Sequence, residues 1–134
     1  MPIKSLLVAL VVGAGTLGLL GPAAAQSPPP AIKRTPLQSF DVPGTSYQTV
    51  IGLAEIGPSA NIGNHTHFGV ESGYVLEGDF TMMIEGQPPK AYKAGDSYVI
   101  APGLAHDARS GEKGAKLIAT YVVEKGKPLA TPAP

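Results

Sequence analysis

Glycine and proline residues interrupt this 134-residue chain at short intervals, and this feature constrains its fold more than any other. The sequence contains 17 glycines and 14 prolines. The intervening segments are short, and several alternate or are rich in β-branched and aromatic residues, as in residues 46–56 and 116–124. This pattern is typical of short strands joined by turns and argues against a helical bundle. We therefore expect an all-β domain, either a small antiparallel β-barrel or a double-sheet jelly roll.

The first 25 residues have the three parts of a secretory signal peptide. Lys4 precedes an apolar run at residues 6–20, and Ala23-Ala24-Ala25 supplies the small residues of a cleavage site. A membrane anchor is the alternative, but glycines interrupt the apolar run. We expect cleavage near Ala25/Gln26, an exported mature chain that is periplasmic or secreted, and no stable insertion of that chain in a membrane.

The remaining chain divides into a leader, a barrel domain and a tail, at residues 26–36, 37–126 and 127–134. Prolines in the leader lack an N–H donor and restrict φ, so we predict an extended tether that joins neither a helix nor a sheet. Residues 74–76 and 80–84 are predicted to form a hairpin around Glu77-Gly78-Asp79. Residues 116–124 are predicted to form a strand buried on both faces.

Charge and cysteine content exclude several classes of function. The chain has 10 basic and 10 acidic residues, so no basic excess favours phosphate, and we expect no nucleic-acid partner. It has no cysteine, which excludes disulfides, thiolate metal sites and cysteine nucleophiles. A small exported domain of this kind must gain its stability from its core, a bound metal or a partner subunit.

All three histidines of the chain form a pattern with one glutamate. His65 and His67 are two residues apart in a predicted strand at 61–68, so their side chains leave the same face. Glu71 follows after a glycine that lets the backbone bend, and His106 lies further along the chain. Three imidazoles and a carboxylate suit a divalent transition metal and leave coordination positions for water or substrate. A lone histidine is usually a surface or core group, but the combined spacing favours a metal site.

The donor set predicts one divalent transition metal and leaves its identity open among Fe, Mn, Ni, Cu, Co and Zn. A closed structural zinc site is disfavoured, because such sites are tetrahedral and usually include thiolate ligands. Availability in an exported compartment decides the native metal as much as affinity does.

These residues resemble the two sequence motifs of the cupin superfamily. The first motif, G-x5-H-x-H-x3,4-E-x6-G, is matched at His65, His67, Glu71 and Gly78, with Ser59 in place of the first glycine. The second motif, G-x5-P-x-G-x2-H-x3-N, is matched at Gly95, Gly103 and His106, with Ala101 and Ser110 in place of the proline and the asparagine. The departures fall on turns and on a residue outside the ligand set.

This resemblance covers most of the mature domain and is closest to short, single-domain exported bacterial cupins. It implies a β-barrel fold and often a homodimer built by packing of sheets. It also implies that the metal ligands are His65, His67, Glu71 and His106. The resemblance identifies no settled substrate.

Three tyrosines are candidates for groups that act beside the metal. Tyr74 lies shortly after the metal-binding motif, and Tyr98 and Tyr121 lie on predicted strands; a core or rim position is the simpler interpretation of each. Asp107 is a candidate partner for the ring of His106. Adjacent strand residues point to opposite faces, so we expect a backbone carbonyl to accept the ring N–H instead.

Two classes of function fit the sequence. The first is a small-molecule metalloenzyme, a dioxygenase or a metal-assisted lyase or isomerase, in which Glu71 acts as a base and Tyr74 as a proton donor. The alternative is a module that captures or senses a small ligand or the metal itself without turnover. Fold analogy does not separate these two classes.

Overall fold

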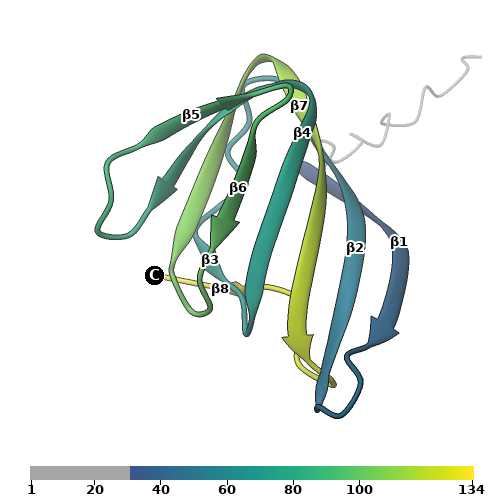
Figure 1. Cartoon of the computed structure of the whole chain (residues 1–134). Helices are drawn as coiled ribbons and strands as arrows, with labels where there is room; N and C mark the ends of the chain where they lie inside the picture. Colours follow the sequence, from purple (N-terminus) through teal and green to yellow (C-terminus); the bar gives the residue numbers. More distant parts are fainter. Residues whose placement is uncertain (1–30) are drawn as a thin grey trace, which may run out of the picture.

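The computed structural model describes residues 31–134 (Figure 1). The expected signal peptide and the first part of the leader lie outside these residues. The described chain contains no helix, and therefore none long and apolar enough to cross a membrane. Its eight strands are β1 (Ile32–Asp41), β2 (Tyr47–Ile56), β3 (His65–Thr66), β4 (Val70–Ile84), β5 (Lys90–Lys93), β6 (Ser97–Ile100), β7 (His106–Glu124) and β8 (Thr131–Pro132).

The strands form one strongly curved antiparallel sheet with β7 at its centre. One path through the sheet has the order β1-β2-β7-β3-β8, and β4 pairs with β5, β6 and β7. Figure 1 shows β4 and β7 as long curved ribbons, and they pair along most of their length. The all-β, antiparallel fold expected from the sequence is confirmed.

The bend of β4 replaces the hairpin predicted around Glu77-Gly78-Asp79. The strand continues through this segment, and its pairing with β7 shifts register on both sides of Gly78. Gly78 has a φ of +72°, and a Cβ on it would lie 2.0 Å from the carbonyl oxygen of Gly114. The hairpin prediction is wrong because bulges and tight turns favour the same residue, a glycine in the left-handed region.

The first strand, β1, includes part of the predicted leader. It pairs with β2 from Ile32 to Asp41, so the prediction that residues 26–36 stay out of the sheet is wrong from Ile32 onward. β1 lies at one end of the strand order, and the register shifts directly after Pro36. Proline is tolerated at a sheet edge, because only one side of the strand must supply hydrogen bonds.

The hydrophobic core lies on one face of the sheet. Along residues 116–124, β7 alternates between buried and half-buried side chains. The prediction that this strand is buried on both faces is therefore wrong for its outer face, where the described chain has no second layer. Val75, Ile100 and Val123 are the largest fully buried side chains of the core. Burying a side chain of this size stabilises a fold by about 1.5–3 kcal/mol.

Candidate metal site

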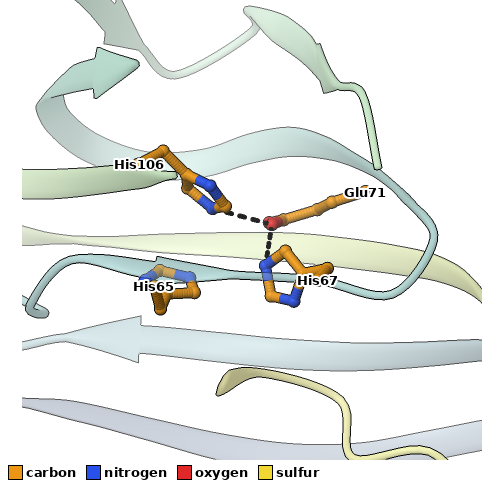
Figure 2. A group of neighbouring side chains, drawn as sticks. All are labelled: His65, His67, Glu71 and His106. Carbon is orange, nitrogen blue, oxygen red and sulfur yellow. Dashed lines mark ion pairs between the residues drawn. The ribbon is translucent and has the colours of Figure 1, made fainter. Parts of the chain in front are cut away.

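The structure brings together the four residues that the sequence identifies as metal ligands. One donor atom from each of His65, His67, Glu71 and His106 lies within 4.8 Å of the others. All four side chains are buried, with 3–8% of their surface exposed. Figure 2 shows the carboxylate of Glu71 between the rings of His67 and His106. Residues far apart in the sequence thus form one compact cluster of three nitrogen donors and one oxygen donor.

Strand pairing explains how two of the histidines meet. His65 of β3 is directly opposite His106 of β7, and the two ring centroids are 4.2 Å apart. The predicted strand at 61–68 is reduced to two residues, with one isolated bridge at Asn61. β7 therefore positions three of the four candidate ligands. It carries His106, and it pairs with β3, which carries His65, and with β4, which carries Glu71.

A glycine next to β4 lets the chain that carries Glu71 approach β7 closely. A Cβ on Gly69 would lie 1.7 Å from the carbonyl oxygen of Val122, so no larger residue fits there. The sequence argument attributed this glycine to a bend in the backbone. The structure instead requires it for the close approach of two segments of main chain.

Each imidazole has one nitrogen held by a backbone carbonyl. The Nδ1 atoms of His65, His67 and His106 lie 2.8, 2.5 and 2.9 Å from the carbonyl oxygens of Gly63, Leu129 and Leu104, respectively. A carbonyl only accepts, so each Nδ1 carries a hydrogen and donates it. In the neutral ring, Nε2 then keeps its lone pair for a metal. The expectation that a carbonyl rather than Asp107 orients His106 is confirmed; Asp107 accepts from the N–H of Gly63 at 2.9 Å.

The last residues of the chain contribute to the site, which the sequence did not reveal. Residues 127–134, predicted as a proline-rich tail, return to β3, where Thr131 is paired with Thr66. This return places the carbonyl of Leu129 against the ring of His67. The only local signal for this return was Leu129, an apolar residue among prolines, which packs against the core.

The carboxylate of Glu71 lies close to three polar side chains. Its Oε2 lies 2.6 Å from Nε2 of His67 and 3.4 Å from Nε2 of His106, and its Oε1 accepts a hydrogen bond of 2.8 Å from the hydroxyl of Tyr98. Burial by itself raises the pKa of Glu71. The interactions with His106, His67 and Tyr98 outweigh burial and lower this pKa to about 2. Glu71 is therefore an anion at neutral pH.

The histidines respond differently to their surroundings. The pKa of His65 is lowered, chiefly because burial disfavours the charged ring. Burial also acts to lower the pKa of His106, but the Glu71 carboxylate and the Leu104 carbonyl outweigh it, and the pKa is raised. Without a metal, His106 thus keeps a proton to higher pH than His65.

Two buried atoms of the cluster indicate that a cation belongs there. Nε2 of His67 and Oε2 of Glu71 have no partner in hydrogen-bond geometry, although they lie only 2.6 Å apart. Buried polar atoms in native proteins are nearly always satisfied. Two lone pairs at this distance repel each other unless a positive charge lies beside both. A divalent metal would satisfy both atoms, and three imidazoles with one carboxylate form a suitable ligand set.

The structure separates the three candidate tyrosines. Tyr98 donates to Glu71, and the ring of Tyr121 lies 5.0 Å from that of His67. Tyr74 is 51% exposed and, three residues after Glu71 on an unbroken stretch of β4, lies on the opposite face of the sheet. The suggested role of Tyr74 as a proton donor is not supported by this position. Applying strand alternation to Glu71 and Tyr74 would have revealed the mismatch.

Both inner phenols remain protonated at neutral pH. Burial and the charge of Glu71 raise the pKa of Tyr98, and the same two causes raise that of Tyr121 to about 12. A neutral phenol donates a hydrogen bond. Tyr98 is therefore a permanent donor to the carboxylate.

We expect Tyr98→Phe to destabilise the metal-free protein by about 1–3 kcal/mol, because it leaves Oε1 of Glu71 buried without its donor. Urea unfolding measures this change. Tyr74→Phe removes a hydroxyl from an exposed side chain on the same sheet and serves as the matched control, with almost no expected change. Equal effects of the two substitutions would contradict the hydrogen bond from Tyr98.

A small cavity adjoins the cluster. Its volume is about 30 Å³, and a water molecule needs about 10–15 Å³ on this scale, so two or three water-sized groups fit. Its polar lining consists of His65, Glu71, His106, Tyr98, Tyr121 and Arg34. Phe80 and Met82 contribute to its apolar walls. A ligand in this cavity would contact three of the four candidate metal ligands.

Comparison with known proteins places the chain among proteins of this fold. The family described as "Cupin domain" matches residues 52–126, more than half of the 134 residues. None of the curated proteins compared is significantly similar in sequence.

Several solved structures are similar in fold. KdgF from Halomonas sp. matches with a TM-score of 0.58 and 22% identity over 75% of this chain and 86% of that chain. Oxalate decarboxylase from Bacillus subtilis matches with a TM-score of 0.59 and 18% identity over 65% of this chain and 24% of that chain. The DMSP lyase DddQ from Ruegeria pomeroyi matches with a TM-score of 0.64 and 15% identity over 77% of this chain and 52% of that chain. At these identities the likeness shows a shared fold, and this chain spans only part of the latter two proteins.

Proposed function

This chain belongs to the cupin superfamily, and on that premise we propose that it is a metalloenzyme that acts on a small molecule through a three-histidine, one-glutamate metal site. The observation that carries the proposal is the pair of buried atoms without hydrogen-bond partners, Nε2 of His67 and Oε2 of Glu71, in a cluster that adjoins a cavity of about 30 Å³. His65, His67, Glu71 and His106 would hold one divalent transition metal. When bound, such an ion supplies Lewis acidity toward a substrate oxygen or activates dioxygen.

The protein groups around the site have distinct roles in this proposal. Carbonyl acceptors orient each imidazole so that its Nε2 faces the cluster. Tyr98 holds Oε1 of Glu71, which leaves Oε2 directed at His67 and His106. The raised pKa of Tyr98 keeps the proton on its phenol, so Tyr98 positions the Glu71 carboxylate through a hydrogen bond and does not take the proton-donor role that the sequence argument assigned to Tyr74.

Bond cleavage in a small substrate is the reaction class that we favour. Two of the similar structures are named a decarboxylase and a lyase. Dioxygenation is the alternative reaction class. A dioxygenase consumes oxygen during turnover and a lyase or decarboxylase of this kind need not, so a measurement of oxygen uptake distinguishes the two classes. Metal-loaded protein that binds a ligand stoichiometrically, without oxygen uptake or product from any candidate substrate, would instead identify a capture or sensing module.

Metal titration at a series of pH values tests the metal site directly. We expect one ion per chain, and an affinity that falls as the pH decreases from about 8 to about 5, because only neutral imidazole coordinates a metal. The raised pKa of His106 means that its proton must be displaced already at a pH above the range of an ordinary histidine. Competition with a chromophoric chelator measures the affinity, and elemental analysis measures the stoichiometry. An affinity independent of pH would contradict the use of these imidazoles.

We also propose that the protein forms a homodimer through the outer face of its sheet. Val70, Tyr74 and Val99 lie on this face with 38, 51 and 70% of their surface exposed, and large apolar side chains exposed together on one face mark an interface. We expect Val99→Glu to give a monomer in sedimentation velocity experiments. Gln87→Glu adds the same charge on an exposed turn and should leave the dimer intact. A monomeric wild-type protein would refute the dimer.

Export is proposed from residues 1–25 alone. The intact mass of the protein recovered from its native cell envelope or medium is expected to correspond to a chain that begins near Gln26. A mass that includes residues 1–25 would refute cleavage.

A further inference from the structure

Arg34 occupies an unusual position on the inner face of the sheet. Its partner in the register of β1 and β2 is Ala54, which is buried in the core. The adjacent Lys33 is opposite Glu55 and forms an exposed ion pair with it at 3.5 Å. Strand alternation therefore directs Lys33 outward and Arg34 inward. Arg34 therefore places a positive charge at the edge of the apolar face of the sheet.

Arg34 has no acidic partner in the described chain. Among residues 31–134, no carboxylate lies within 4.0 Å of its guanidinium. Arg34 lines the same cavity as the inner phenols of Tyr98 and Tyr121, and its positive charge opposes the rise in the pKa of both. Arg34 is exposed to solvent, so its charge is tolerated, and its guanidinium carries five N–H donors, of which Tyr121 can accept one.

Arg34 also lines two cavities. Among residues 31–134, it is the only basic side chain apart from the histidines that lines the cavity beside the metal cluster. It lines, together with Tyr121, a second cavity of about 50 Å³ whose other lining residues are all uncharged. A ligand group bound by Arg34 in the first cavity would thus lie beside the metal cluster.

We propose that Arg34 binds the carboxylate of the substrate, so that the substrate class of this site is a small organic acid. This inference rests on the proposed function, because it assumes that the bound acid also contacts the proposed metal. A guanidinium binds a carboxylate through two parallel charge-assisted hydrogen bonds, and the neutral phenol of Tyr121 is a further donor. A divalent ion with one carboxylate ligand leaves one positive charge, to which Arg34 adds a second, so the cavity favours an anion. The size of the two cavities limits the acid to a few heavy atoms.

The test compares propionate with propionamide, which has the same shape and no charge, as probes of the metal-loaded protein in titration calorimetry or ligand-observed NMR. Wild-type protein is expected to bind propionate and to discriminate against propionamide. Arg34→Gln should weaken propionate binding by about tenfold or more. Lys33→Gln removes the same charge one residue away on the opposite face and should change propionate binding by less than about twofold. Elemental analysis should find the same metal content in both variants.

Three results would overturn the inference: equal affinities for the two probes, no binding of propionate to wild-type protein, or an Arg34→Gln variant that binds propionate like wild type. In the last case, a loss of propionate binding with His67→Ala would show that the acid contacts the metal alone, which leaves the proposed function standing. The same titrations on metal-free protein distinguish a failure of the proposed metal site from a failure of the proposed carboxylate site at Arg34. If wild-type protein takes up no metal, the proposed function fails. Binding of propionate that depends on Arg34 would then still support the carboxylate site.

Discussion

Replacing His106 with alanine is expected to abolish metal binding. In the presence of metal, the variant should melt roughly 10–20 °C below the wild-type protein. His106 supplies one of the four clustered donors, and its Nε2 lies 3.4 Å from the Glu71 carboxylate. A ligand that binds only the native state at 100 times its dissociation constant contributes about 2.7 kcal/mol, which is lost when the site is broken. Calorimetry measures the melting temperature, and elemental analysis measures the metal.

The control for this substitution is wild-type protein stripped of metal, since all three histidines of the chain belong to the cluster. The difference between the two metal-free proteins reports the packing lost with the ring. The remaining difference reports the metal. Glu71→Gln keeps an oxygen at the site and is expected to weaken metal binding less than the loss of a histidine. Full metal content in His106→Ala would show that His106 is not a ligand.

Gly78→Ala is expected to destabilise the fold by more than about 4 kcal/mol, which is exceptional for one methyl group. The added Cβ would lie 2.0 Å from the carbonyl oxygen of Gly114. The Cβ is bonded directly to the main chain of β4 and the oxygen belongs to the main chain of β7, so neither atom can rotate away. The alanine would also have to adopt a φ near +72°. That conformation alone costs an L-residue about 1–2 kcal/mol. Urea unfolding of the metal-free protein measures the total.

Gly86→Ala is the matched control for this prediction. Gly86 has almost the same φ, +76°, but a Cβ there would meet no atom within 4 Å. Its substitution should therefore cost only the conformational part, about 1–2 kcal/mol. The excess for Gly78 measures the close approach of β4 and β7 at the bend. Equal losses at the two glycines would mean that the strands are not in contact there.

The sequence by itself determined the elements whose signals are local. Residues 46–56 alternate as a strand must, and they form β2 almost to the residue. The four donor side chains were identified because a two-residue histidine spacing and a nearby glutamate are local features. Their offsets also matched known motifs, which supplied the distant His106. The carbonyl that orients His106 was expected as well, since strand alternation directs Asp107 away from it.

Tertiary structure alone decided which further groups meet the cluster. Tyr98 rather than Tyr74 contacts Glu71 because β6 pairs with β4 in a register that no local pattern contains. Leu129 reaches His67 only because the chain returns to β3, and Arg34 reaches the cavity only because β1 joins an edge where proline is tolerated. Periodicity along a chain tells which side of a strand a residue occupies. It carries no information about the partner strand. Pairing between segments distant in the sequence is what places Tyr98, Leu129 and Arg34 around the four clustered donors.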